Sequence, residues 1–180
     1  MARNTDTIDY REDYYWGLAG IYSRRNMRTA IKIGDLDKEM GLILDFGCGV
    51  GHLKKKLAGK NVVGYDIMPE LSEIDDYKNL RPNKIVLLSV LEHLHLDEIY
   101  KLLNEFLAMN PEAELVVLLP TENFISKIAM RLAGQSNAHD DHVSRYKDIN
   151  KAIEKYYYPQ KRVYNFWGMA QITKYVNKNL

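Results

Sequence analysis

The sequence is poor in three features, and each shortage excludes a class of protein. A single cysteine among 180 residues leaves no partner for an intrachain disulfide, which excludes a disulfide framework and fits a reducing compartment. No apolar run approaches the roughly 20 residues that a membrane-spanning helix needs. The start of the sequence, 1–18, carries charges where a signal peptide would have its apolar stretch. The sequence therefore predicts a cytoplasmic protein.

Neither sign of charge is in excess. The 25 Lys and Arg residues nearly balance the 24 Asp and Glu residues, for a net charge of +1. This balance excludes a strongly basic protein that coats nucleic acid, although a local basic patch remains compatible with it. Hydrophobic residues make up 46% of the chain, which is ordinary for a globular protein. The length predicts a single domain over 1–180, with an N-terminal helical arm over 1–37 and a core over 40–180.

Short apolar runs alternate with amphipathic stretches along the core. Four of these runs have the length of buried strands, at about 41–46, 61–66, 84–90 and 114–119. Helical spacing is present over about 20–33, 52–58 and 146–157, and Asp97 and Thr121 are expected to cap two further helices. Two last strand-like runs, about 161–167 and 169–176, meet near Trp167. The pattern predicts an α/β fold, with a doubly wound, mostly parallel sheet and a C-terminal antiparallel strand pair.

A glycine cluster follows the first predicted strand. Gly47, Gly49 and Gly51 stand at the turn into the next helix, where glycine lets the backbone bend sharply and approach a ligand. The next strand ends on Asp66, and an acid at that place in a doubly wound sheet reaches a ribose. Together these parts predict a site for a nucleoside-containing cofactor.

The spacing of the glycines differs from the dinucleotide fingerprint G-x-G-x-x-G, because His52 occupies the place of the third glycine. The order of an acid, one residue and three alternating glycines resembles the Rossmann-like class I S-adenosylmethionine-dependent methyltransferases. The run 89–94, SVLEHL, is similar to a segment of their type 11/12-like subgroup. The resemblance covers roughly 40–120 and implies S-adenosyl-L-methionine as cofactor. The cofactor-binding residues that it implies are Asp45, Phe46, Gly47, Cys48, Gly49, Gly51, Asp66, Ile67, Ser89 and Val90.

The role of Cys48 and the length of the stretch after Asp66 both bear on this predicted cofactor site. Cys48 reads as a small loop filler rather than a nucleophile, because no activating base is spaced beside it. Only the short stretch 67–83 separates Asp66 from Lys84, where the family usually fits a helix, another strand and an acid that contacts adenine. We therefore expect the third strand to be reduced or missing and the adenine to be more exposed. Asp75 or Asp76 stands in for the missing acid or is a solvated turn residue.

Three histidines are candidates for catalysis. Methyl transfer is an in-line displacement that depends on positioning, and a base is needed only when the acceptor must lose a proton. His93 follows the third predicted strand, and His139 and His142 lie in a polar loop. Each is a candidate base. The alternative for His93 is a residue at a helix start that bonds to the backbone, and the alternative for His139 and His142 is a surface loop without a catalytic role. The run 139–142, HDDH, could also bind a divalent metal. Some RNA-ribose methyltransferases build a metal site from a Glu-x-x-Glu-His run and later histidines. Ser89 replaces the first of those glutamates here, so no metal site is predicted.

The acceptor follows mainly by elimination. The Asn/Asp-Pro-Pro-aromatic run of amino-methylating nucleic-acid enzymes is missing, and the net charge gives no reason for binding a large RNA. A small-molecule, glycan or lipid-linked acceptor is the predicted class. The alternatives are a catalytically silent methyltransferase-like module that binds a protein, and a metal-assisted RNA methyltransferase. An aromatic N-terminal arm, with Tyr14, Tyr15, Trp16 and Tyr22, is expected across the cofactor mouth or in the core.

Overall fold

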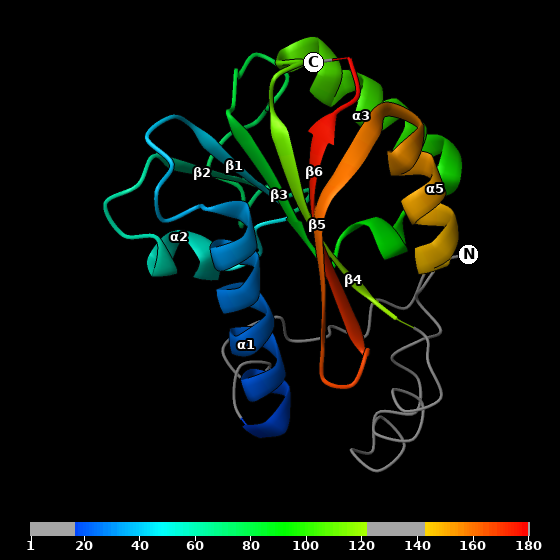
Figure 1. Ribbon diagram of the computed structural model, residues 1–180. Coiled ribbons are helices and arrows are strands. Elements are labelled where there is room, and N and C mark those ends of the chain that lie inside the picture. Colours follow the sequence, from blue (N-terminus) through cyan, green and yellow to red (C-terminus); the bar gives the residue numbers. More distant parts are fainter. Residues whose placement is uncertain (1–16, 122–142, 180) are drawn as a thin grey trace, which may run out of the picture.

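The computed structural model describes residues 17–121 and 143–179, which form one sheet with helices on both faces (Figure 1). The strand order is β2-β1-β3-β4-β6-β5. In chain order the elements are α1 (Gly17–Gly34), β1 (Ile43–Phe46), α2 (His52–Lys56), β2 (Val62–Tyr65), β3 (Lys84–Leu88), the 3₁₀ turn η2 (Leu91–His93), α3 (Leu96–Met109), β4 (Glu114–Pro120), α5 (Tyr146–Tyr156), β5 (Tyr157–Asn165) and β6 (Ala170–Asn177).

The sheet combines parallel strands with an antiparallel C-terminal pair. β1 runs parallel to β2 and to β3, and β3 runs parallel to β4. β6 is antiparallel to both β4 and β5. The predicted fold class is therefore confirmed, including the strand pair at the C-terminal end.

Each central strand is apolar throughout because both faces of the sheet are covered. In β4, Leu115 and Val117 belong to one core cluster while Val116 and Leu118 belong to the other. The first cluster includes the apolar faces of α3 and α5, and the second includes those of α1 and α2. Figure 1 shows these helix pairs on opposite faces of the sheet. This double coverage explains why the strands read as continuous apolar runs rather than alternating ones.

The segment after β2 is as short as the sequence predicts. Residues 66–83 contain turns and bends but neither a helix nor a strand, so β2 forms an edge of the sheet. This agrees with the expectation that the third strand is missing. A segment of this length cannot cross the sheet, add a strand and return to β3 at ordinary element lengths.

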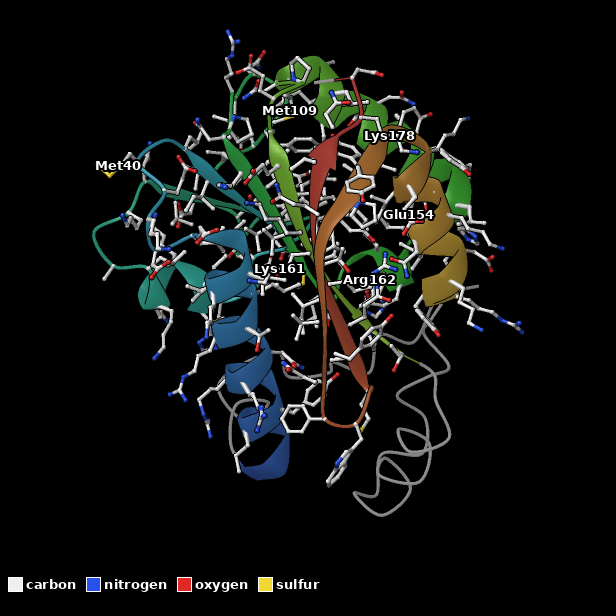
Figure 2. All side chains as sticks on the ribbon, in the orientation of Figure 1. Met40, Met109, Glu154, Lys161, Arg162 and Lys178 are labelled. Carbon is white, nitrogen blue, oxygen red and sulfur yellow. The ribbon has the colours of Figure 1, made fainter. Side chains whose placement is uncertain are left out.

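Two boundaries differ from the sequence-based expectation. The residue that caps α3 is His95 rather than Asp97, and the backbone N–H of His95 donates to Glu98 Oε2 at 2.8 Å. Strand β5 begins at Tyr157, directly after α5 and ahead of the predicted start at 161. Along β5 the side chains alternate between faces, so Arg162 lies on the α5 side and bonds Glu154 at 2.6 Å (Figure 2). β5 is an edge strand with many polar residues, so its sequence lacks the apolar alternation that would have predicted its full length.

Several predictions lie outside the described residues. They concern the helix after Thr121, the polar loop that carries His139 and His142, and the aromatic residues before residue 17. Of the helices in the described part of the chain, none is both long and apolar enough to cross a membrane.

Candidate active site

The chemically notable residues follow the carboxyl ends of the parallel strands. The glycine loop follows β1, Asp66 follows β2, and Ser89 follows β3. Because these three strands are parallel neighbours, their carboxyl ends lie at one edge of the sheet. In doubly wound folds the ligand crevice lies at this edge.

The glycine loop adopts left-handed backbone conformations that favour glycine. Gly47, Gly49 and Gly51 have φ values of 76°, 51° and 73°. A Cβ on Gly47 would lie 2.5 Å from Val90 Cγ2, whereas Cβ atoms on Gly49 and Gly51 would meet nothing within 4 Å. The first glycine is therefore required by packing. The other two leave an open surface of backbone that a ligand can approach.

Asp66 lies against this loop. Its Oδ2 accepts a hydrogen bond from the backbone N–H of Gly49 at 2.9 Å, and its Oδ1 accepts one from Met68 at 3.1 Å. These bonds fix the carboxylate beside the loop, although Asp66 and Gly49 belong to segments that follow different strands. The next residue, Ile67, is 87% exposed. An exposed apolar side chain beside a fixed carboxylate suits a base next to its ribose.

Asp45 is a buried carboxyl at the end of β1. Its exposed fraction is 3%, and no described residue donates a hydrogen bond to it. Burial, with smaller contributions from Asp66 and Glu73, raises its pKa to about 7. A buried acid without a donor is costly. A cation bound beside it would offset that cost.

The side chains of Phe46 and Cys48 serve the fold. The Phe46 ring lies 5.2 Å from Tyr65, 5.0 Å from Tyr77 and 5.4 Å from Phe106 between ring centroids. The Cys48 thiol contacts the carbonyl oxygen of Leu71 at 3.5 Å, and burial raises its pKa to about 12. A thiol with this pKa is not a nucleophile at neutral pH, which agrees with its interpretation as a loop filler.

Glu73 is the acid that the short segment after Asp66 brings back to the sheet. Its Oε2 lies 2.6 Å from Lys54 Nζ and 3.4 Å from the backbone nitrogen of Gly64. Asp75 and Asp76 are exposed, and Asp76 accepts a bond from the backbone N–H of Lys78 at 2.9 Å. This geometry favours the turn-residue interpretation of Asp76.

The run after β3 holds a second buried carboxyl, which sequence reasoning did not include among the site residues. Ser89 has a φ of 58°, so the chain turns sharply there. Glu92 is 3% exposed, its Oε2 has no hydrogen-bond partner, and burial raises its pKa to about 8. The bond that its carboxyl shares with Ser89 lowers the pKa by less than burial raises it. By sequence alone a glutamate at this place fits a helix's first turn, where the dipole favours it, as well as a pocket, and its burial is what marks it.

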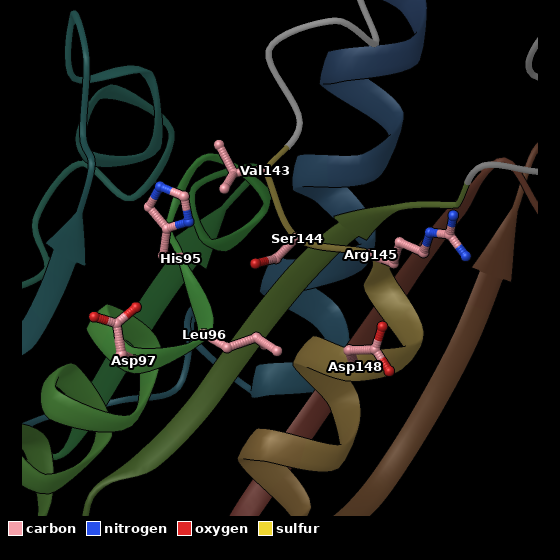
Figure 3. A pocket seen from close by; sticks show the side chains of 7 residues that line it. All are labelled: His95, Leu96, Asp97, Val143, Ser144, Arg145 and Asp148. Carbon is pink, nitrogen blue, oxygen red and sulfur yellow. The ribbon is translucent and has the colours of Figure 1, made fainter.

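His93 is exposed on η2. A pocket of about 450 Å³ lies between the N-termini of α3 and α5 (Figure 3). His95, Ser144, Arg145 and two carboxylates, Asp97 and Asp148, line this pocket. The segment before α5 is held to η2, because the backbone nitrogen of residue 143 donates to the Glu92 carbonyl at 2.9 Å and the Ser144 hydroxyl donates to the Leu94 carbonyl at 2.7 Å. The pocket therefore lies at the same edge of the sheet as the glycine loop.

Comparison with known proteins decides the family. The family model described as "Methyltransferase domain" matches residues 18–172. The chain belongs to this methyltransferase family. The family uses S-adenosylmethionine, so the predicted cofactor is confirmed at the level of the family. Among curated proteins, none matches the sequence significantly.

Solved structures share the fold of this chain at low sequence identity. The N-methyltransferase NodS from Bradyrhizobium japonicum, in complex with S-adenosylhomocysteine, is 16% identical with a TM-score of 0.67, and the match covers 94% of each chain. Magnesium protoporphyrin IX methyltransferase from Synechocystis, with bound S-adenosylhomocysteine, is 17% identical with a TM-score of 0.65 over 88% of this chain and 84% of that one. The PH0226 protein from Pyrococcus horikoshii is 15% identical with a TM-score of 0.68 over 94% of each chain.

The structure brings most of the predicted cofactor residues to one place. The glycine loop, Asp45 and Asp66 are adjacent, and Val90 packs on Gly47. Two of the three candidate bases, His139 and His142, lie outside the described residues. The described residues contain no group of three or more metal-ligating side chains.

Proposed function

We propose that the protein is a methyltransferase that transfers a methyl group from S-adenosylmethionine to a small-molecule or glycan- or lipid-linked acceptor. The observation that carries the proposal is the Asp45 carboxyl. It is buried, with no hydrogen-bond donor among the described residues, next to a loop whose Gly49 and Gly51 are open. An aminoacyl group carries the ammonium that this carboxyl lacks, and it is thin enough to lie on glycine backbone.

The residues at the edge of the sheet fit each part of the cofactor. Gly49 and Gly51 would border the aminoacyl end, with Asp45 facing its ammonium. Asp66, held by two backbone N–H groups, would accept hydrogen bonds from the ribose hydroxyls. The exposed Ile67 would cover one face of the adenine. Ser89 and Val90 would border the methionine portion, as the family resemblance implies.

The chemistry of the site is mainly positioning. The bound cofactor supplies an electrophilic methyl group on a sulfonium. The chain's own residues hold the acceptor in line and exclude water from the reacting atoms. For an alcohol acceptor, His93, His139 or His142 would take the proton, and an amine that is already neutral would need no base.

The pocket beside η2 supports a small acceptor. It lies at the same edge of the sheet as the predicted cofactor residues without including them, and its volume of about 450 Å³ is in the range of small-molecule sites. Two similar structures are those of an N-methyltransferase and of magnesium protoporphyrin IX methyltransferase. These comparisons favour a small-molecule acceptor over a macromolecular one.

Calorimetric titration with S-adenosylhomocysteine tests the proposal. The parent should bind at micromolar concentration. Gly49→Ala should bind at least about tenfold more weakly, because a methyl group would occupy the open surface of the loop. Gly59→Ala is the matched control, since Gly59 also has a positive φ, 87°, and its Cβ would meet nothing within 4 Å, but it lies beyond α2. Both variants therefore carry the same kind of backbone strain, and they differ in whether the added methyl group lies in the glycine loop.

Two results would contradict the proposal. Equal affinity in Gly49→Ala and the parent would remove the glycine loop from the binding site. No binding by the parent at millimolar concentration would favour the silent, protein-binding module, because residues 66–83 provide neither a helix nor a strand beside the adenine. A pull-down with the parent protein would then be the next measurement.

A further inference from the structure

A basic groove lies between α1 and the edge strand β5, on the face of the sheet opposite α5. Arg25, Arg28 and Lys32 line it from α1, and their spacing of three and four residues places them on one face of the helix. Lys161, Val163 and Asn165 line it from β5, at the alternate positions that share one face of a strand. The groove has a volume of about 400 Å³. Figure 2 shows Lys161 on the α1 side of β5 and its neighbour Arg162 on the α5 side.

The four cations of this groove have no carboxylate partner among the described residues. Nearby cations do: Arg162 pairs with Glu154 at 2.6 Å on the other face, and Lys174 on β6 pairs with Glu114 at 3.1 Å. Arg25 lies 5.3 Å above the ring of Phe166 but meets no acid in the described chain. Like charges gathered in one hollow repel each other. An anionic ligand would relieve that repulsion.

Two residues that line the groove, Asn165 and Thr29, belong to one hydrogen-bond cluster. The buried Asn165 donates from Nδ2 to Asn26 Oδ1 and to Thr29 Oγ1, both at 2.9 Å. The Nδ2 atom of Asn26 is itself buried and has no acceptor. A buried donor without an acceptor is uncommon in native proteins. Asn26 contacts Asn165, which lines the groove, so this unsatisfied donor lies one side chain away from the groove.

We propose that this groove binds a compact polyphosphate group, a diphosphate or a longer one. From Arg25 to Lys32 the helix rises by about 10 Å, so the cations are crowded over the length of a di- or triphosphate. Two arginines supply the forked donors that match phosphate oxygens. A nucleic acid backbone would need a longer track, since such proteins typically make about 6–10 phosphate contacts. This proposal does not depend on the methyltransferase proposal, because none of the residues that line the groove is a predicted cofactor contact.

One end of the groove lies near the turn between β5 and β6. Arg25 stacks on Phe166 in the turn between β5 and β6, and Thr121 at the end of β4 donates its hydroxyl proton to Gly168 in that same turn. A ligand whose phosphates occupy the groove can therefore extend toward the edge that holds the glycine loop. The phosphates belong either to a soluble molecule or to a lipid headgroup.

The test is calorimetric titration of the full chain with inorganic tripolyphosphate at physiological salt. Arg28→Glu/Lys161→Glu reverses one charge on each wall, and Lys101→Glu/Lys147→Glu is the matched control, because these lysines lie on α3 and α5 at the opposite face. The groove variant should lose at least about tenfold in affinity while the control keeps it. If charge reversal disturbs folding, Arg28→Gln/Lys161→Gln gives the same comparison.

Three outcomes would overturn the proposal. They are no tripolyphosphate binding by the parent, an equal loss in the groove and control variants, and binding to a single-stranded RNA but not to tripolyphosphate. Vesicles of phosphatidylcholine with diacylglycerol pyrophosphate separate the two sources. If the protein binds these vesicles and tripolyphosphate releases it, the ligand is a lipid headgroup. If the protein binds tripolyphosphate but not the vesicles, the ligand is a soluble molecule. S-adenosylhomocysteine titrated into the same samples keeps a failure here distinct from a failure of the methyltransferase proposal.

Discussion

Replacing Asp45 by asparagine should change how the stability of the protein depends on pH. The carboxyl is 3% exposed, and its folded-state pKa of about 7 lies above the ordinary 3.8 because burial disfavours the charged form. Between these two pH values the folded protein binds more protons than the unfolded chain. The contribution of Asp45 is therefore intact below about pH 4 and is lost progressively as the pH rises to 7.

The size of the effect follows from the two pKa values. At 1.36 kcal/mol for each pH unit, a rise from 3.8 to about 7 corresponds to about 4 kcal/mol of lost stability above pH 7. Asparagine cannot ionise, so Asp45→Asn should gain about 4 kcal/mol relative to the parent between pH 4 and pH 8. Urea unfolding followed by circular dichroism at pH 4, 6 and 8 measures the difference.

The control for this experiment is Asp37→Asn, which makes the same substitution at an exposed side chain. The same slope in Asp45→Asn and the parent would show that Asp45 does not retain its proton, and would refute the reasoning. The variant should also fail to bind S-adenosylhomocysteine, since a neutral amide cannot offset the ligand's ammonium. Gain of stability with loss of binding is the combined result expected of a functional buried charge.

Three further variants test other parts of the site. Asp66→Ala should weaken S-adenosylhomocysteine binding by about 1.5–3 kcal/mol in calorimetry, through loss of a charge-assisted bond, and unchanged affinity would remove Asp66 from the ribose site. Gly47→Ala should lower the free energy of unfolding by about 2–5 kcal/mol, because its Cβ would lie 2.5 Å from Val90 at a φ of 76°. Gly59→Ala should cost only about 1–2 kcal/mol, so equal costs in urea would contradict the packing argument. Glu92→Gln should gain stability relative to the parent from pH 5 to pH 9, because burial raises that pKa to about 8, and a constant difference would mean that the carboxyl ionises normally.

The sequence predicted the parts of this protein that depend on local pattern. Continuous apolar runs identified the parallel strands, and the spacing from Asp45 through the three glycines to Asp66 indicated the family and its cofactor. The shortness of the stretch 67–83 predicted the missing strand from chain length alone. These inferences worked because strand period, glycine geometry and reach along the chain are local properties.

Tertiary structure decided which polar groups are buried and which ones meet. The sequence places Asp45 in a buried strand, but only the structure shows that no described residue donates a hydrogen bond to its carboxyl. Glu92 looks like an ordinary acid of a short helical turn, and only packing from distant elements removes its carboxyl from water. A helical row of cations such as Arg25 and Arg28 reads as a solvated face until β5, near the other end of the chain, places Lys161 opposite it. Burial, pKa and charge clustering arise from contacts between segments far apart in the chain, so no local pattern encodes them.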